Sequence, residues 1–152
     1  MSNKLFDELV GDHYKIKDLL EKMIDSSEIS LKSRSKFFQH FKGELIPHIK
    51  AEEIVYYTVL KTKRESHEKA LESLEEHHVA ELVLAELDKI NPDEDLWKAK
   101  VTVLNELINH HIDEEEDIIF DLTEELLDDT KIDDIYKNFV EEKNGFKKRL
   151  VA

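Results

Sequence analysis

Residues 48–57 have the sequence His-Ile-Lys-Ala-Glu-Glu-Ile-Val-Tyr-Tyr, and residues 111–120 have the related sequence His-Ile-Asp-Glu-Glu-Glu-Asp-Ile-Ile-Phe. Each copy contains a His and a Glu four residues apart, then a second Glu, then apolar residues that end in an aromatic side chain. Side chains four residues apart lie one above the other on the same face of an α-helix. Such a His–Glu pair can bind one metal ion, and two copies that face each other can bind two.

The composition favours a single all-α domain over residues 1–152. The chain is 40% hydrophobic and contains only 3 Gly and 2 Pro, which is typical of long helices with short connections. The formal net charge of −14 disfavours partners such as nucleic acids and anionic membrane surfaces. The absence of Cys excludes disulfides and thiolate metal sites.

The sequence contains no targeting or membrane-spanning signal that we can identify. The first residues lack the apolar core of a signal peptide, and no stretch approaches the roughly 20 apolar residues of a membrane span. We therefore expect a cytoplasmic protein.

Apolar residues recur at steps of three and four in four long segments, which predicts four helices. These span about residues 3–24, 30–63, 66–90 and 91–127. Their short connections favour an antiparallel up-down-up-down four-helix bundle over about residues 3–128. Pro47 lies inside the second helix, where its ring crowds the carbonyl of Gly43, so we predict a kink just before His48.

Local signals predict where these helices begin. Ser2 or Asn3 is expected to cap the first helix, and residues 25–27 to separate it from the second. For the fourth helix we predict Asn91 as the N-cap and Pro92 as the first helical residue.

A short fifth helix is predicted over about residues 131–150. Thr130 and Asp133 resemble the two ends of a capping box that would open it, and Asn144-Gly145 is expected to interrupt it. We find no ligand candidate in this segment, so we interpret it as packing or partner surface.

Polar residues interrupt the apolar stripe on the inward face of each of the four main helices. They are His13 in the first helix, His48 and Glu52 in the second, His77 in the third, and His111 and Glu115 in the fourth. The stripes are expected to continue through Val55 and Val59 in the second helix and through Ile118 and Leu122 in the fourth. Because the order of a single His and then His-x-x-x-Glu occurs twice, we interpret the bundle as two copies of one helical hairpin.

Two inward carboxylates with no inward Lys or Arg need another source of positive charge. Burying an ionised carboxylate costs several kcal/mol, which a pair of divalent metal ions would offset. Imidazole and carboxylate suit iron, with zinc or manganese as alternatives, and the two carboxylates can bridge two ions. A single buried His is usually a core residue and a Glu run is usually a solvated face. The repeated pattern in phase with the stripes favours a metal site.

These residues resemble the pattern of the hemerythrin-like, or HHE cation-binding, family over about residues 5–125. The resemblance rests on Asp12-His13, on Pro47-His48-Ile49-Lys50-Ala51-Glu52-Glu53 with Tyr57, on Glu76-His77-His78, and on His110-His111 and Glu114-Glu115-Glu116 with Phe120. The family folds as a four-helix bundle around a non-haem di-iron centre. The resemblance implies two iron ions, bridged by carboxylates and by an oxo or hydroxo group. It implies as ligands His13, His48, Glu52, His77, His111 and Glu115, with the two Glu as bridges.

The third helix departs from the pattern of oxygen-carrying hemerythrins. Those proteins have a His-x-x-x-His pair there, whereas the residue four after His77 is Glu81 in this chain. Glu81, His78 or His110 are the candidates to complete the site. His40 and His67 lie off the stripes and are expected on the surface.

The resemblance implies a protein that binds or senses oxygen, nitric oxide or iron, with a small diatomic molecule as its partner. The alternative is a di-iron enzyme of oxidative or nitrosative stress defence, acting in peroxide breakdown or iron–sulfur repair, with Tyr14, Tyr56 or Tyr57 near the metals. A metal-free acidic interaction domain is a third hypothesis. Ferritin-like chemistry is a weaker one, because it needs two Glu-x-x-His motifs.

Overall fold

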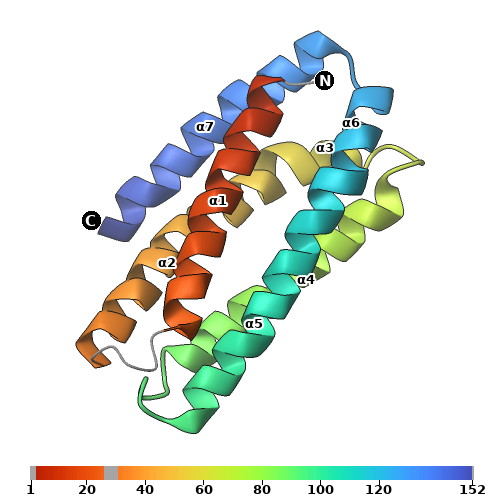
Figure 1. Ribbon diagram of the computed structural model, residues 1–152. Coiled ribbons are helices and arrows are strands. Elements are labelled where there is room, and N and C mark those ends of the chain that lie inside the picture. The colour runs from red at the N-terminus through yellow and green to blue at the C-terminus, as the bar shows by residue number, and fades with distance from the viewer. Residues whose placement is uncertain (1–2, 26–30, 152) are drawn as a thin grey trace.

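The computed structural model describes residues 3–25 and 31–151, and within these ranges the chain forms helices and no strand (Figure 1). The long helices are α1 (Lys4–Ile24), α2 (Leu31–Glu52), α4 (His67–Leu87), α5 (Asp95–Glu114) and α7 (Asp129–Val151). Shorter segments continue two of them, η2 (Glu53–Tyr57) and α3 (Thr58–Leu60) after α2, and η3 (Glu115–Ile119) and α6 (Phe120–Leu126) after α5. The predicted all-α class is confirmed.

The first four long helices run alternately up and down the molecule and pack around a common interior (Figure 1). α1 contacts α2 and α5, and α4 contacts α5 and α2, so the four helices close a ring. α7 lies on the outside of this ring, against α1 and α2. Its 23 residues make it the longest helix, so the prediction of a short fifth helix was wrong.

The ends of α1 follow from local hydrogen bonds. The Asn3 side chain accepts the backbone N–H of Phe6 at 2.8 Å, as predicted for an N-cap. The alternative cap Ser2 lies outside the described residues. The predicted break begins at Asp25, whose N–H donates to the carbonyl of Glu21, and its remaining residues are also outside the described ranges.

α5 begins later than the sequence predicts. Its N-cap is Glu94 and its first residue is Asp95, so Asn91 and Pro92 precede the helix. The Asn91 carbonyl accepts the N–H of Glu94 at 3.0 Å, and the Asn91 side chain accepts that of Asp93 at 3.3 Å. These bonds close a turn before the helix, which explains why Pro92 is tolerated there.

The start of α7 also differs from the prediction. Asp128 Oδ1 accepts the N–H of Lys131 at 2.8 Å, so Asp128 performs the capping role predicted for Thr130. The helix then continues through Gly145 without interruption. A Gly inside a helix costs about 1 kcal/mol. The buried side chains of α7, among them Phe139, outweigh that cost.

Replacing Asp128 by Ala is expected to lower the free energy of unfolding by about 1 kcal/mol, because one N–H group at the start of α7 loses its partner. Urea denaturation followed by circular dichroism would measure the change. Thr130→Ala is the matched control and should change the stability little. An equal loss in both variants would contradict the assignment of the cap to Asp128.

A π-helical turn lies at each of the two predicted ligand carboxylates. η2 begins directly after Glu52, and η3 begins at Glu115. A π-turn holds an extra residue compared with an α-turn, so it shifts by one position the residues that face inward. The two halves of the internal repeat therefore share this backbone irregularity as well as their predicted ligands.

For this reason the predicted stripes beyond the carboxylates were only partly correct, since Val55 and Val59 pack against the core but are not fully buried. In η2, which continues α2, the buried residues are Tyr56 and Tyr57, while Val55 is only half-buried. In η3, which continues α5, Ile119 is 1% exposed, whereas the predicted Ile118 is 38% exposed. The shift places aromatic hydroxyls inside the bundle where the α-helical period predicts Val.

The apolar core is divided into two clusters. One fills the end of the bundle that contains Phe41 and Trp97, and the other fills the end that contains Leu9 and Tyr57. The predicted polar residues lie along each helix between members of the two clusters, so they form a layer across the middle of the bundle. The packed ends keep this layer out of contact with bulk water.

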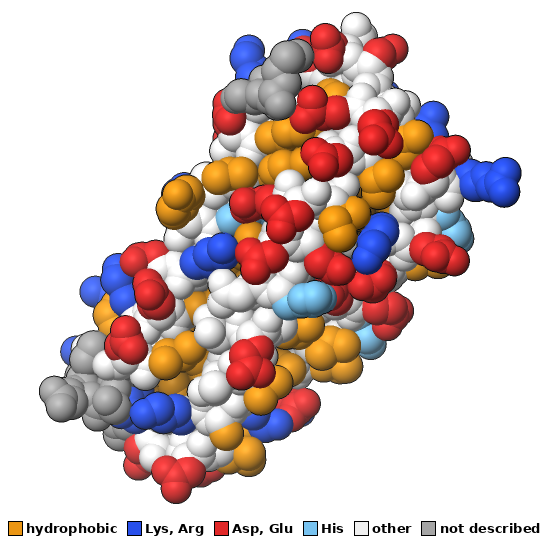
Figure 2. Space-filling view, turned by 45° about the vertical axis from the view of Figure 1, so that its right-hand side comes forward, with side chains coloured by type: hydrophobic (Ala, Val, Ile, Leu, Met, Phe, Trp, Pro, Cys, Tyr) orange, Lys and Arg blue, Asp and Glu red, His pale blue; other side chains and the backbone are white. Residues whose placement is uncertain are grey.

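The outer surface is acidic, in keeping with the net charge of −14. Figure 2 shows Asp and Glu side chains spread over the face in view, with fewer Lys and Arg among them. Among the described helices, none combines the length and the apolar character needed to span a bilayer.

Candidate metal centre

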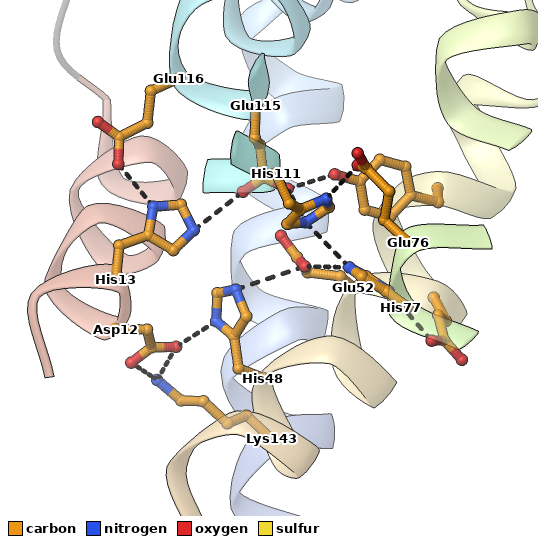
Figure 3. Close-up of polar contacts among 12 residues, drawn as sticks. Asp12, His13, His48, Glu52, Glu76, His77, His111, Glu115, Glu116 and Lys143 are labelled. Atoms are coloured by element: carbon orange, nitrogen blue, oxygen red, sulfur yellow. Dashed lines mark hydrogen bonds and ion pairs between the residues drawn. The ribbon is translucent and has the colours of Figure 1, made fainter. Parts of the chain in front are cut away.

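The six predicted ligands come together in the polar layer, although they lie on four different helices: α1, α2, α4, and α5 with its continuation η3. Figure 3 shows their imidazoles and carboxylates pointing toward one another. Their exposed fractions are 2% for His13, 2% for His48, 0% for Glu52, 2% for His77, 5% for His111 and 0% for Glu115. Residues that are far apart in the sequence thus form one buried cluster of nitrogen and oxygen donors.

Glu52 lies between two imidazoles. Its Oε1 atom is 3.4 Å from Nε2 of His48 and 3.3 Å from Nε2 of His77. His48 is on the same helix as Glu52, one turn away, whereas His77 approaches from α4. A carboxylate placed between two imidazoles from different helices has the arrangement expected of a bridging ligand.

Glu115 occupies the equivalent position in the second half of the bundle. Its Oε1 atom is 3.1 Å from Nε2 of His13, and its Oε2 atom is 3.7 Å from Nε2 of His111. The donor atoms of the centre thus form two groups, each close enough together to bind one metal ion. One contains His13, His48, Glu52 and Glu115, and the other contains Glu52, His77 and His111. Because Glu52 belongs to both groups, it joins them.

The outward nitrogen of each imidazole donates to a different acid. The Nδ1 partners are Asp12 for His48 at 2.8 Å, Glu53 for His77 at 3.1 Å, Glu76 for His111 at 2.8 Å and Glu116 for His13 at 2.6 Å. A carboxylate on Nδ1 fixes the orientation of the ring and leaves Nε2 free to bind a metal. All four Nε2 atoms therefore face the centre.

These four acids form a ring around the site, which the sequence analysis missed. Each lies directly beside a ligand in the sequence, as Asp12 does beside His13. Each nevertheless supports the imidazole of a neighbouring helix, so that Asp12 holds His48. The signal was present in the sequence, because an acid adjoins each of the lone histidines His13 and His77 and each predicted ligand Glu. Only the packing shows which imidazole each acid contacts.

Several buried atoms at the centre have no hydrogen bond of good geometry with another described residue, although ion-pair partners lie 3.1 to 3.4 Å from three of them. They are both carboxylate oxygens of Glu52, Oε1 of Glu115 and Nε2 of His13. In addition, the Nε2 atoms of His77 and His111 lie 3.1 Å apart, so in the metal-free protein one of these imidazoles donates an N–H to the other. A buried acceptor without a partner is costly, and cations that bind several such atoms at once remove that cost. The donor set therefore fits metal ions.

The charges of the centre are strongly coupled. Burial lowers the pKa of His48, but the charge of Glu52, the hydrogen bond to Asp12 and the charge of Asp12 outweigh burial and raise this pKa to about 10. Burial likewise opposes the charged form of His77, but its close contacts with the carboxylates of Glu52 and Glu53 raise the pKa to about 9. Burial raises the pKa of Glu52, but His48 and His77 hold it well below its usual range. In the absence of metal, protons on the imidazoles supply the positive charge.

The three candidates for an additional ligand lie outside the buried groups. Glu81 is partly exposed and pairs with a different group, since its Oε1 atom is 2.7 Å from Nζ of Lys50. His78 is exposed, and His110 is 62% exposed. His40 and His67 are exposed as well, which confirms that prediction.

His110 belongs instead to a group at the surface. It lies 3.8 Å from Glu76 and 3.6 Å from Glu114, and these three residues are also within coordinating reach of one another. Lys69 already neutralises Glu114 at 3.2 Å. We therefore assign the metal centre to the buried groups only.

Tyr57 contributes a further polar group to the centre. Its hydroxyl donates to Oε2 of Glu115, and its ring packs edge-on against His77, with the ring centroids 5.6 Å apart. Burial raises the pKa of Tyr57 well above its usual value, so the phenol stays neutral and remains a donor. The π-turn brings this residue inward, which explains why the stripe did not predict its position.

A small cavity adjoins the centre on the side of Trp97. Its volume of about 10 Å³ is the room that roughly one water-sized molecule needs. The lining combines metal-site imidazoles with apolar side chains, and consists of His13, Ile16, Leu45, His48, Ile49, Glu76, His77, Ala80, Leu107, Ile108, His111 and Ile112. The cavity therefore has room for no more than about one water-sized molecule.

Comparisons with known proteins agree with this geometry. The sequence model described as "Hemerythrin HHE cation binding domain" matches residues 4–123, which include all six predicted ligands. A search of curated proteins and one of solved structures found no match. The match covers most of the chain and leaves α7 and the last three residues of α6 outside it. The chain therefore belongs to the hemerythrin HHE cation-binding domain family.

Proposed function

We propose that this protein is a non-haem di-iron protein that binds or senses a small diatomic molecule, oxygen or nitric oxide. The observation that carries the proposal is the juxtaposition of two buried His/Glu groups with a cavity the size of one small molecule. Sensing of iron itself through occupancy of the same centre belongs to the same proposal.

The residues present divide naturally between two metal positions. His13, His48 and Glu115 would hold one ion, His77 and His111 the other, and Glu52 reaches both. When bound, a pair of iron ions supplies redox-active positions at which a diatomic ligand binds.

The protein contributes exclusion and orientation. Apolar side chains such as Ile49 and Ile108 close the cavity, so bulk water and large substrates do not reach the centre. The ring of acids on the Nδ1 atoms keeps the imidazoles in place through a change in occupancy. A preformed and enclosed site of this kind favours reversible binding over turnover of a bulky substrate.

One observation favours the alternative of a di-iron enzyme of oxidative or nitrosative stress defence, acting in peroxide breakdown or iron–sulfur repair. The hydroxyl of Tyr57 donates to Glu115, so a phenol lies in direct contact with a predicted ligand. A phenol in this place can donate a proton or an electron to the centre. Its contact with Glu115 also serves a purely structural role, because it satisfies one oxygen of a buried carboxylate.

The decisive experiment is iron analysis of the purified protein together with optical spectra of the reduced, oxidised and aerated forms. We expect about two irons per chain, since two groups of donors are present. An absorption band that appears on aeration and disappears when oxygen is removed would support binding or sensing. Absence of bound iron would refute both the proposal and its alternative.

Tyr57→Phe separates the two functions. If the centre only binds its ligand, the variant keeps its iron and its reversible band, because the ring still packs against His77. If the protein is an enzyme, the variant keeps its iron but loses peroxide turnover by roughly the 100-fold or more typical of a lost proton donor. Peroxide consumption by the wild type and by the variant measures this, and Tyr14→Phe, at a position that is 73% exposed, is the control.

A further inference from the structure

Lys143 on α7 is the only Lys or Arg side chain that is buried in residues 3–25 and 31–151. It is 5% exposed, and its Nζ atom lies 2.5 Å from Oε1 of Glu8 and 3.0 and 3.1 Å from the two carboxylate oxygens of Asp12. Both partners are on α1. A buried ammonium group that binds both oxygens of one carboxylate holds that carboxylate in a single orientation.

Asp12 connects this ammonium group to the metal centre. Its Oδ2 atom accepts the Nδ1–H of His48 at 2.8 Å while Lys143 holds the same carboxylate from the other side (Figure 3). A second contact comes from the same helix, because the ring of Phe139 packs edge-on against His48, with the centroids 5.7 Å apart. α7 thus acts on His48 in two ways, through the ion pair of Lys143 with Asp12 and through the direct ring contact of Phe139.

The acids that support the other three imidazoles are different. Asp12 is 3% exposed, whereas the side chains of Glu53, Glu76 and Glu116 are 24%, 14% and 34% exposed. Glu53 pairs with Lys50 at 3.5 Å, but that lysine is itself 34% exposed. Only His48 therefore has an outer partner that is buried and neutralised by a buried cation.

Fold stability alone gives weak grounds for this lysine. A buried ion pair adds little net stability compared with apolar side chains of similar size, because the desolvation of both charges offsets their attraction. α7 already buries Ile132, Ile135 and Phe139 against the bundle. A function in orienting Asp12 and reducing its negative charge accounts for the lysine better than packing does.

We propose that Lys143 is a positioning residue of the metal centre. It holds Asp12 in place, Asp12 in turn orients His48, and α7 thereby contributes to metal binding. This inference rests on the proposed function only in that the buried groups bind iron. It also assigns a role to the one long helix that lies outside residues 4–123 matched by the family. Because Lys143 supports one imidazole of four, its removal should affect the two metal positions unequally.

The test compares Lys143→Met with Lys147→Met. Lys147 is on the same helix and its Nζ atom lies 3.3 Å from Glu44 of α2, so it also ties α7 to the bundle. Glu44, however, contacts none of the described imidazoles of the centre. The two variants thus remove the same charge from the same helix. Only Lys143→Met removes a contact with Asp12, the hydrogen-bond partner of His48.

Two measurements are needed, one with metal and one without. Anaerobic competition between Fe(II) and a chromophoric chelator should show that Lys143→Met weakens one of the two iron positions by about 10- to 100-fold, as expected for loss of an outer partner. Lys147→Met should retain the wild-type affinities, and Lys143→Arg should recover most of the loss. In the metal-free protein, the ring ¹⁵N shifts of His48 should change in Lys143→Met, while those of His77 should not.

Equal iron affinities and unchanged His48 shifts in Lys143→Met would overturn the inference. If the wild type binds no iron, the proposed function fails, and the His48 shifts still decide whether Lys143 positions that ring. If Lys143→Met does not fold because Asp12 is left uncompensated, the double variant Lys143→Met/Asp12→Asn removes both charges and should fold. It should show the same weakened iron position, and wild-type affinity in that variant would also overturn the inference.

Discussion

Replacing Glu52 by Gln is expected to remove most of the bound metal, by more than about 100-fold in affinity, a larger effect than the loss of an outer partner. Glu52 is the residue that both groups of donors share, and its carboxylate lies between His48 and His77. Gln keeps the size of the side chain but removes the charge and one of the two equivalent oxygens. Metal content after gel filtration and competition with a chelator would measure the loss.

Glu81→Gln is the matched control for this substitution. Glu81 is also a carboxylate and lies one helical turn after His77 on α4, but the structure pairs it with Lys50 instead of placing it among the donors. The control should keep its metal. Equal losses in both variants would show that Glu81 completes the site after all, and an unchanged metal content in Glu52→Gln would refute the assignment of Glu52.

Metal affinity is expected to rise steeply with pH. The pKa of His48 is about 10 and that of His77 about 9 in the metal-free protein, so both imidazoles carry a proton at neutral pH. A metal ion binds only the neutral imidazole, so binding releases about two protons, and the affinity should fall by about 100-fold for each pH unit below 9. Titration with Fe(II) under argon in several buffers would measure the slope, and an affinity independent of pH would contradict it.

The stability of the metal-free protein should change with pH in the opposite direction. Folding raises the pKa values of His48 and His77 above the ordinary value of 6.5. The resulting stabilisation is therefore fully present below pH 6.5 and is lost as the pH rises through 9 and 10. Urea denaturation of the metal-free protein should show a decreasing free energy of unfolding over this range. The metal-loaded protein is the control, because there the metal replaces the protons.

The helices and the candidate ligands follow from local features of the sequence. His48 and Glu52 are four residues apart, and the geometry of a single helix is enough to place them on one face. The same holds for His111 and Glu115. His13 and His77 lie in phase with apolar neighbours such as Ile16 and Leu84, so their inward direction also follows from the helical period.

The features that the helical period alone did not predict depend on small changes of geometry or on distant contacts. Tyr57 faces the centre because a π-turn adds one residue after Glu52, and no residue type in that stretch signals the turn. Glu81 follows His77 at the spacing of a ligand, yet it pairs with Lys50 because that lysine lies within 2.7 Å on the neighbouring helix. Propensity and period do not report such competition between partners.

The sequence by itself thus determined an all-α chain whose four inward stripes carry His and Glu at ligand spacing, because these properties depend on contacts within one or two helical turns. The tertiary structure decided which imidazole each acid supports and where α7 packs. Lys143 and Asp12 are 131 residues apart in the sequence, and their contact exists only because α7 packs along α1 and α2. Contacts of this kind depend on how whole helices dock, which the local periodicity of a chain does not encode.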